Sequence, residues 1–188
     1  LGIVGLGKIG QRLSRMASAI GFQVVAFDPY LPQSAAAACG ARLAPLDEVV
    51  ASADYVSVNA PLTKETHHLI GAAELARMKP SAYLVNTSRG PVVDEAALVS
   101  ALRDKAIAGA ALDVVENEPP AADHPLRAMK NVILNPHAAY YSRRSYQELH
   151  RRVAEEVARV LGGHYPQSLV NPAVKPRLRE IGRDLAEG

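Results

Sequence analysis

The sequence predicts an α/β fold, a doubly wound parallel sheet with helices on both faces. Short apolar runs alternate with segments of helical periodicity, which favours βαβ units. A glycine-rich turn, Gly5-Leu6-Gly7-Lys8-Ile9-Gly10, comes directly after the first apolar run. Residues able to bind an acid or exchange a proton follow three of the later apolar runs. In open parallel sheets, ligands bind beyond these carboxyl ends of the strands.

The first half of the chain is expected to hold four strands. Gly21 is expected to end the first helix, and Asp28-Pro29 to stop the strand that follows it. Pro61 comes shortly after the fourth strand and breaks it. The predicted strands are 3–4, 22–27, 41–43 and 55–58, and the predicted helices are 8–20 and 46–51.

The second half continues the same alternation. Asp94 is a plausible N-cap, and Glu95 places a negative charge in the first turn of the helix that follows. The last helix carries apolar residues at helical spacing, and Gly162-Gly163 ends it. The predicted strands are 83–86, 108–115 and 131–134, and the predicted helices are 72–78, 94–105 and 142–161.

The composition limits the class of protein. The 188 residues are 48% hydrophobic and 21% charged, which is ordinary for a folded globular chain. The formal net charge of +2 is too small to indicate a nucleic-acid or anionic-membrane partner. Cys39 is the only cysteine, so no internal disulfide is expected and the cytoplasm is favoured. No apolar stretch is long enough to span a bilayer.

The glycine-rich turn fits a Rossmann-type nucleotide site. Gly5 permits the sharp turn, Gly7 lets a pyrophosphate approach the backbone, and Gly10 lets the helix pack on the strand. Asp28, at the end of the next strand, can accept hydrogen bonds from a ribose and repel a 2′-phosphate, which favours NAD over NADP. The alternative is a structural turn followed by a strand-ending Asp-Pro.

Arg89, Glu118 and His137 form the predicted chemical site, since each follows a strand of the second half. The guanidinium could hold a carboxylate through two hydrogen bonds, and the imidazole could exchange a proton with a hydroxyl. Glu118 would orient the imidazole ring. The alternative for Arg89 is a surface arginine. No metal site is expected, and no role is assigned to His67, His68, His124, His150 or His164.

These motifs, taken in order from Gly2 to about Pro172, resemble the D-isomer-specific 2-hydroxyacid dehydrogenases. The resemblance implies that Arg89 binds the substrate carboxylate and polarises its carbonyl, that His137 is the acid/base, and that Glu118 is its partner. It also implies that Asp113 meets the nicotinamide carboxamide. The residues expected at the cofactor are Gly5, Gly7, Lys8, Ile9, Gly10, Asp28, Ala60, Pro61, Thr87, Ser88, Asp113 and Ala139.

Within the family, the chain is most similar to the branch around C-terminal-binding protein and its bacterial relatives. The phrases Asp28-Pro29-Tyr30-Leu31 and His67-His68-Leu69-Ile70 carry that similarity. Asn59 stands where the family commonly has His, and Tyr140 stands where the C-terminal-binding proteins have Trp. Glu118 differs from the Gln of the formate dehydrogenases.

The resemblance also implies a domain organisation. Residues 1–170 are expected to form the NAD-binding domain, and 171–188 a tail returning toward a substrate domain that is missing from this chain. Because that domain would supply the lid that expels water, we expect these 188 residues to bind NAD but turn over slowly or not at all.

Two functions remain open at this point. The first is an NAD-dependent oxidoreductase acting on D-2-hydroxy acids, expected to be a homodimer because relatives usually dimerise through this domain. The second is an NAD(H)-sensing module akin to a corepressor, which would not need Glu118 or His137. The pairs Arg143-Arg144 and Arg151-Arg152 lie on the polar side of the last helix, so a solvated face is favoured over nucleic-acid binding.

Overall fold

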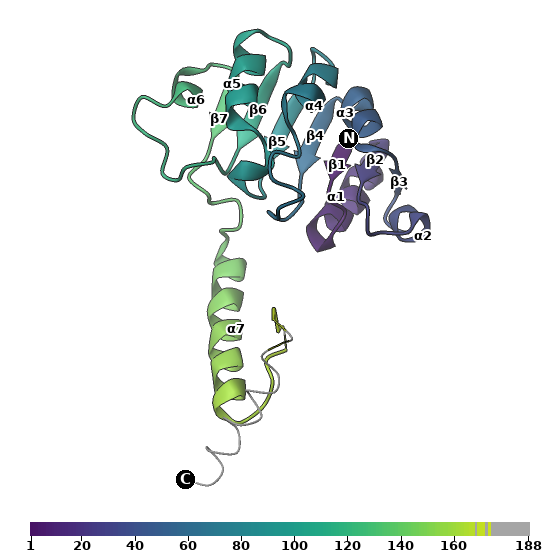
Figure 1. Cartoon of the computed structure of the whole chain (residues 1–188). Coiled ribbons are helices and arrows are strands. Elements are labelled where there is room, and N and C mark those ends of the chain that lie inside the picture. Colours follow the sequence, from purple (N-terminus) through teal and green to yellow (C-terminus); the bar gives the residue numbers. More distant parts are fainter. Residues whose placement is uncertain (168, 172, 174–188) are drawn as a thin grey trace. The chain divides into compact units, whose positions relative to one another are not determined.

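A computed structural model describes residues 1–167, 169–171 and 173, and the chain divides into two compact units, Leu1–Ala139 and Tyr140–Gly188. The first unit contains a seven-stranded sheet in the order β3-β2-β1-β4-β5-β6-β7 (Figure 1). All neighbouring strands are parallel. The strand order reverses direction between β1 and β4, so the predicted doubly wound α/β fold is confirmed.

The strands are short, and a helix or loop separates each from the next. The strands are β1 (Gly2–Val4), β2 (Val24–Phe27), β3 (Ala41–Leu43), β4 (Tyr55–Val58), β5 (Tyr83–Asn86), β6 (Gly109–Leu112) and β7 (Val132–Leu134). The helices of this unit are α1 (Lys8–Ala19), α2 (Gln33–Ala37), α3 (Leu46–Ser52), α4 (Ala72–Arg77), the 3-10 helix η1 (Gly90–Val92), α5 (Glu95–Arg103) and α6 (Pro125–Ala128).

The sheet separates two hydrophobic clusters, because successive residues of a strand point to opposite faces. Val4 belongs to the larger cluster, together with residues of α3, α4 and α5. Its neighbour Ile3 belongs to the smaller cluster, together with residues of α1 and α2. Helices therefore cover both faces of the sheet, and α3, α4 and α5 form one row in Figure 1.

Several predicted boundaries differ from the structure. Helix α5 begins after Asp94, whose Oδ1 accepts the Ala97 N–H at 2.9 Å, but it ends at Arg103 because Lys105 takes a left-handed φ of 56°. The predicted strand 108–115 ends at Leu112, since the Val115 N–H turns to the Glu118 carboxylate. The predicted strand 22–27 begins only at Val24. Helices α2 and α6 and the 3-10 helix η1 were not predicted.

The second unit contains helix α7 (Arg143–Leu161), which begins after the predicted N-terminal residue Ser142. The Ser142 hydroxyl accepts the Ser145 N–H at 3.1 Å. No residue of α7 is buried, and the apolar side chains predicted at helical spacing are exposed except for the half-buried Val160. The tail predicted at 171–188 lies outside the described residues except for Asn171 and Ala173, and the domain boundary at 170 stays a prediction.

No helix in the described part of the chain is long and apolar enough to cross a membrane.

Leu84 provides a test of the core, because it lies in the central part of the sheet with 0% exposure. We expect Leu84→Ala to lower the free energy of unfolding by about 3 kcal/mol through lost burial and the cavity that remains. Leu62→Ala is the matched control at an exposed site and should cost less than ~1 kcal/mol. Denaturant titration of both variants measures the difference, and equal losses would contradict this description of the core.

Candidate functional site

The residues of the candidate site follow the carboxyl ends of the parallel strands. Gly5 follows β1, and its N–H donates to the Phe27 carbonyl at the end of β2 at 2.8 Å. Asn59 follows β4, and its N–H donates to the Val4 carbonyl at 2.7 Å. The turns after β1, β2 and β4 therefore meet at the point where the strand order reverses, which is where open α/β sheets bind ligands.

Each glycine of the Gly5–Gly10 turn has a different environment. Gly5 has a φ of 91°, and a Cβ there would lie 2.6 Å from the Ala60 nitrogen. A Cβ at Gly10 would lie 2.3 Å from the Gly5 oxygen, so helix α1 packs directly on the turn. A Cβ at Gly7 would meet nothing within 4 Å, which leaves open space above the start of the helix. This arrangement fits a turn that admits a phosphate at Gly7.

Asp28 joins the glycine-rich turn to the end of β2. One carboxylate oxygen accepts the Leu6 N–H at 2.8 Å, and the other accepts the Tyr30 N–H at 3.0 Å. A hollow of about 290 Å³ opens beside it. Four predicted residues and two that the sequence reasoning missed are among those lining this hollow: Gly5, Asp28, Ala60 and Pro61, and Tyr30 and Leu69.

Asn86 organises the turn that carries Arg89. Its buried side-chain oxygen accepts the N–H and the hydroxyl of Ser88 at 3.0 and 2.8 Å, and its amide nitrogen donates to the Arg89 carbonyl at 3.0 Å. The Arg89 side chain is exposed and donates to the Ser88 carbonyl at 2.6 Å. No ion pair involving Arg89 occurs among the described residues, so its charge is available to an anionic ligand.

His137 and Glu118 form a pair, with Nδ1 of the ring 2.7 Å from Oε2 of the carboxylate. The other oxygen, Oε1, accepts the Val115 N–H at 3.2 Å, which fixes the direction of the Glu118 side chain. An ionised Glu118 would only accept, so Nδ1 would donate in this contact and Nε2 would be left for a ligand.

Asp113 holds the turn on which His137 lies. The His137 N–H donates to the Asp113 carbonyl at 2.8 Å, and His137 has a left-handed φ of 53°. The buried Asp113 carboxylate accepts the N–H groups of Ala138 and Ala139 at 2.8 to 3.0 Å. Asp113 therefore supports the backbone of the turn, a role that the sequence reasoning missed. The contact with a nicotinamide carboxamide stays a prediction.

The structure brings some of the predicted residues together and leaves others apart. Asp113, Glu118 and His137 line one cavity of about 510 Å³, and Arg127, which was not predicted, lines it as well. Arg89 is not among the residues that line this cavity, and no hydrogen bond or ion pair joins it to His137 in the described part of the chain. Ile9, Thr87 and Ala139 are exposed at their turns. Lys8 and Pro61 are exposed as well, while Ser88 is half-buried.

The sequence is similar to a family of dehydrogenases and to two curated enzymes. Residues 1–139 match the family described as D-isomer specific 2-hydroxyacid dehydrogenase, NAD binding domain. The chain is 43% identical over 174 residues to a glyoxylate reductase of Korarchaeum cryptofilum, covering 93% of this chain and 52% of that protein. It is 40% identical over 172 residues to a D-3-phosphoglycerate dehydrogenase of Methanocaldococcus jannaschii, covering 91% of this chain and 33% of that protein.

Solved structures agree with the sequence matches. A D-lactate dehydrogenase from Treponema pallidum superposes with a TM-score of 0.83 at 36% identity, over 90% of this chain and 55% of that one. A D-isomer specific 2-hydroxyacid dehydrogenase from Lactobacillus delbrueckii ssp. bulgaricus, in an NAD-complexed form, superposes with a TM-score of 0.81 at 33% identity, again over 90% and 55%. The chain thus spans about half, or less, of the length of these relatives.

The two glycines Gly7 and Gly10 allow folding and binding to be separated. Gly10→Ala should cost about 2 kcal/mol or more of unfolding free energy, because the methyl group meets the backbone oxygen of Gly5. Gly7→Ala meets no atom and should cost at most about 1 kcal/mol, as a poorer N-cap. It should still weaken NADH binding at least about tenfold by blocking the phosphates. Thermal unfolding and NADH fluorescence titration measure both effects, and unchanged NADH affinity in Gly7→Ala would exclude this turn as the binding site.

Proposed function

Because the chain belongs to the D-isomer-specific 2-hydroxyacid dehydrogenase family through its NAD-binding domain, we propose that it works in hydride transfer between a D-2-hydroxy acid and NAD. The observation that carries the proposal is the His137–Glu118 pair, whose ring nitrogen and carboxylate oxygen lie 2.7 Å apart. Glu118 follows β6 and His137 follows β7. Both strands belong to the sheet whose strand β1 leads into the glycine-rich turn.

The residues around the glycine-rich turn fit NAD. The open space at Gly7 and the exposed N-terminus of α1 suit a pyrophosphate, and the Asp28 carboxylate beside this turn suits a ribose hydroxyl. The hollow beside Asp28 has an apolar lining that includes Leu69 and Pro61, which suits the adenine ring. We assign the other cofactor contacts to Lys8, Ile9, Ala60, Thr87, Ser88, Asp113 and Ala139.

We divide the chemistry between Arg89 and the His137–Glu118 pair. Arg89, with no acidic partner among the described residues, binds the substrate carboxylate and, in the reverse reaction, polarises the carbonyl of the 2-oxo acid. His137 takes the hydroxyl proton at Nε2 while the hydrogen on the same carbon leaves as hydride. Glu118 stabilises the imidazolium that results. Bound NAD supplies the hydride acceptor, and the reverse reaction returns both hydrogens to a 2-oxo acid.

A second candidate function is an NAD(H)-sensing module akin to a corepressor. It would need the glycine-rich turn and Asp28 but no proton acceptor. The hydrogen bond that Glu118 makes to His137 favours the enzyme, because an oriented imidazole at a strand end serves proton transfer. Binding of NADH without any change in NADH oxidation on addition of 2-oxo acids would favour the sensor.

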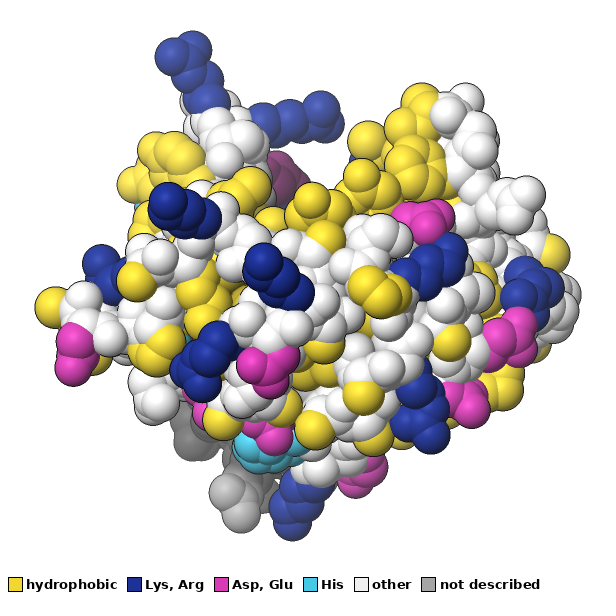
Figure 2. Space-filling model, turned by 90° about the horizontal axis from the view of Figure 1, so that it is seen from above, with side chains coloured by type: hydrophobic (Ala, Val, Ile, Leu, Met, Phe, Trp, Pro, Cys, Tyr) yellow, Lys and Arg dark blue, Asp and Glu magenta, His cyan; other side chains and the backbone are white. Residues whose placement is uncertain are grey.

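We further propose a homodimer that binds neither nucleic acid nor membrane and works in the cytosol. Basic and acidic side chains are interspersed on the face shown in Figure 2, which does not suit a polyanion. Arg151 and Arg152 of α7 are hydrogen-bonded to Glu148, and these guanidinium groups hold the pKa of Glu148 at about 2. Cys39 is a buried free thiol, which is consistent with a reducing compartment.

The proposed roles can be tested by NADH oxidation with a panel of 2-oxo acids that includes glyoxylate and pyruvate. Because the chain spans about half the length of the relatives it matches, we expect slow turnover and propose single-turnover measurements. His137→Ala should reduce the rate at least about 100-fold through loss of the general acid, with NADH affinity unchanged. His150→Ala, at an exposed position of α7, is the control. An unaltered rate in His137→Ala would remove this residue from the mechanism.

The preference for NADH over NADPH tests Asp28. Asp28→Asn keeps an oxygen for the Leu6 N–H but removes the negative charge that repels a 2′-phosphate. The ratio of the dissociation constants for NADPH and NADH should fall by about tenfold or more. Asp47→Asn removes a carboxylate at the start of α3 and should leave the ratio unchanged. If both variants keep the wild-type ratio, Asp28 does not select the cofactor.

A further inference from the structure

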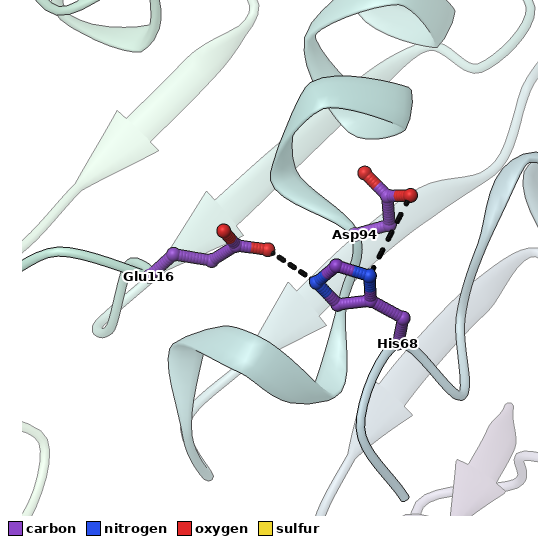
Figure 3. A group of neighbouring side chains, drawn as sticks. All are labelled: His68, Asp94 and Glu116. Carbon is purple, nitrogen blue, oxygen red and sulfur yellow. Dashed lines mark hydrogen bonds and ion pairs between the residues drawn. The ribbon is translucent and has the colours of Figure 1, made fainter.

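Three segments that are distant in the sequence meet at the N-terminus of α5. His68 lies between β4 and α4, Asp94 caps α5, and Glu116 lies in the loop that follows β6. Figure 3 shows the His68 ring between the two carboxylates. Its Nε2 is 2.7 Å from Oε1 of Glu116, and its Nδ1 is 3.8 Å from Oδ2 of Asp94. The ring thus bridges two loops of the candidate site.

His68, Asp94 and Glu116 lie close enough together to bind a metal ion, because their donor atoms are within 4.8 Å of one another. However, the two ring nitrogens face different carboxylates, and a single ion can bind only one of them. Both carboxylates are also used by the backbone: Glu116 accepts the Glu95 N–H at 3.2 Å, and Asp94 accepts the Ala97 N–H at 2.9 Å. The arrangement fits an imidazole that is hydrogen-bonded to Glu116, with Asp94 beside its other nitrogen, better than a metal site.

A second set of contacts fixes the same loop to α5. Glu95 and Glu116 exchange hydrogen bonds, because the side chain of each accepts the backbone N–H of the other, at 3.0 and 3.2 Å. The remaining Glu95 oxygen bonds the His124 ring at 2.8 Å, and both side chains are only 16% exposed. The loop is therefore attached at Glu116 and at His124. Glu118, the partner of His137, lies between these two attachments.

The turn that carries Arg89 belongs to the same assembly. The His68 N–H donates to the Pro91 carbonyl at 2.8 Å, and Ile70 and Val93 form a parallel bridge. A Cβ at Gly90 would lie 1.9 Å from the Val115 oxygen and 2.6 Å from the Glu116 nitrogen. The chain directly after Arg89 therefore lies against the backbone that leads to Glu118, and His68 is bonded to both.

We propose that His68 is a positioning residue, which through Glu116 holds the Glu118 loop in the register that keeps the hydrogen bond from His137 to Glu118. The inference rests on the proposed function for the roles of Glu118 and His137, but the geometry that carries it is independent of any reaction. Glu116 transmits the effect, because only Asn117 separates it from Glu118. Loss of the bridge leaves only the contacts with Glu95 at that end of the loop, so Glu118 holds the His137 ring less firmly.

The backbone of His68 determines which variants are informative. Its φ of 53° is in the left-handed region, which Asn tolerates better than Ala. His68→Asn therefore keeps the backbone conformation but removes the ring that reaches Glu116. Glu116→Gln is the milder change at the other end, since it keeps the shape and removes the charge. Glu48→Gln, which breaks the exposed pair with Arg42 at 2.6 Å, is the matched control.

The test measures which ring nitrogen of His137 carries the proton. It uses long-range ¹H–¹⁵N correlation on ¹⁵N-histidine-labelled protein, at a pH above the usual titration range of histidine. The wild-type ring should carry its proton on Nδ1, and Glu118→Ala defines the spectrum of the unpaired ring. His68→Asn and Glu116→Gln should each move the His137 signals at least halfway toward that reference. The double variant should do no more than either single one, because all remove the same bridge. Glu48→Gln should match the wild type.

Two outcomes would overturn the inference. One is a His137 spectrum unchanged in both His68→Asn and Glu116→Gln. The other is a shift of the His68 signals on adding one equivalent of Zn²⁺ to the wild type, which would identify a metal site. NADH titration of the same samples separates this inference from the proposed function. Wild-type protein that fails to bind NADH but shows the expected spectra would refute the function alone, and normal NADH binding with unchanged spectra would refute the positioning role alone.

Discussion

Asp113 stands at the end of β6 with 5% of its surface exposed, and its carboxylate accepts the N–H groups of Ala138 and Ala139. A buried carboxylate is costly unless it is hydrogen-bonded, so these bonds compensate the burial and at the same time fix the turn after β7. Strands β6 and β7 pair in parallel with Leu112 opposite Leu134, which places Asp113 beside the turn it binds. The orientation of His137 toward Glu118 depends on this arrangement, since the left-handed backbone of His137 is held there by its bond to the Asp113 carbonyl.

The candidate site is assembled from loops whose apolar residues, such as Ile70, Val93 and Val115, pack in the larger core cluster. The sheet brings the loops to one edge, but their mutual register comes from polar contacts around the start of α5. Asp94 caps that helix, Glu95 binds the Glu116 backbone, and His68 lies between the two loops. Hydrogen bonds in such a network support one another in a half-buried environment. Across the described residues, no buried side-chain polar atom lacks a partner.

Much of the fold was predictable because its signals are local. The β-branched and aromatic runs 55–58 and 83–86 match β4 and β5, and Asp94 and Ser142 are the N-caps of α5 and α7. The glycine-rich turn and the family were also predicted, while the branch around C-terminal-binding protein stays a prediction. The roles of His68, His124 and Asp113 were not predictable, because their partners lie far along the chain. His68 was assigned no role, yet it pairs with Glu116 across 48 positions of sequence.

The exchange of hydrogen bonds between Glu95 and Glu116 also has an evolutionary consequence. Each side chain satisfies the main chain of the other residue, so a mutation at one position leaves an amide at the second without its acceptor. A replacement at either position that lacks a side-chain acceptor therefore costs stability, and we expect the two positions to change together. Lineages in which one glutamate has been replaced should therefore carry a compensating change at the other, and ancestors reconstructed between them should have passed through few intermediates that differ at only one of the two.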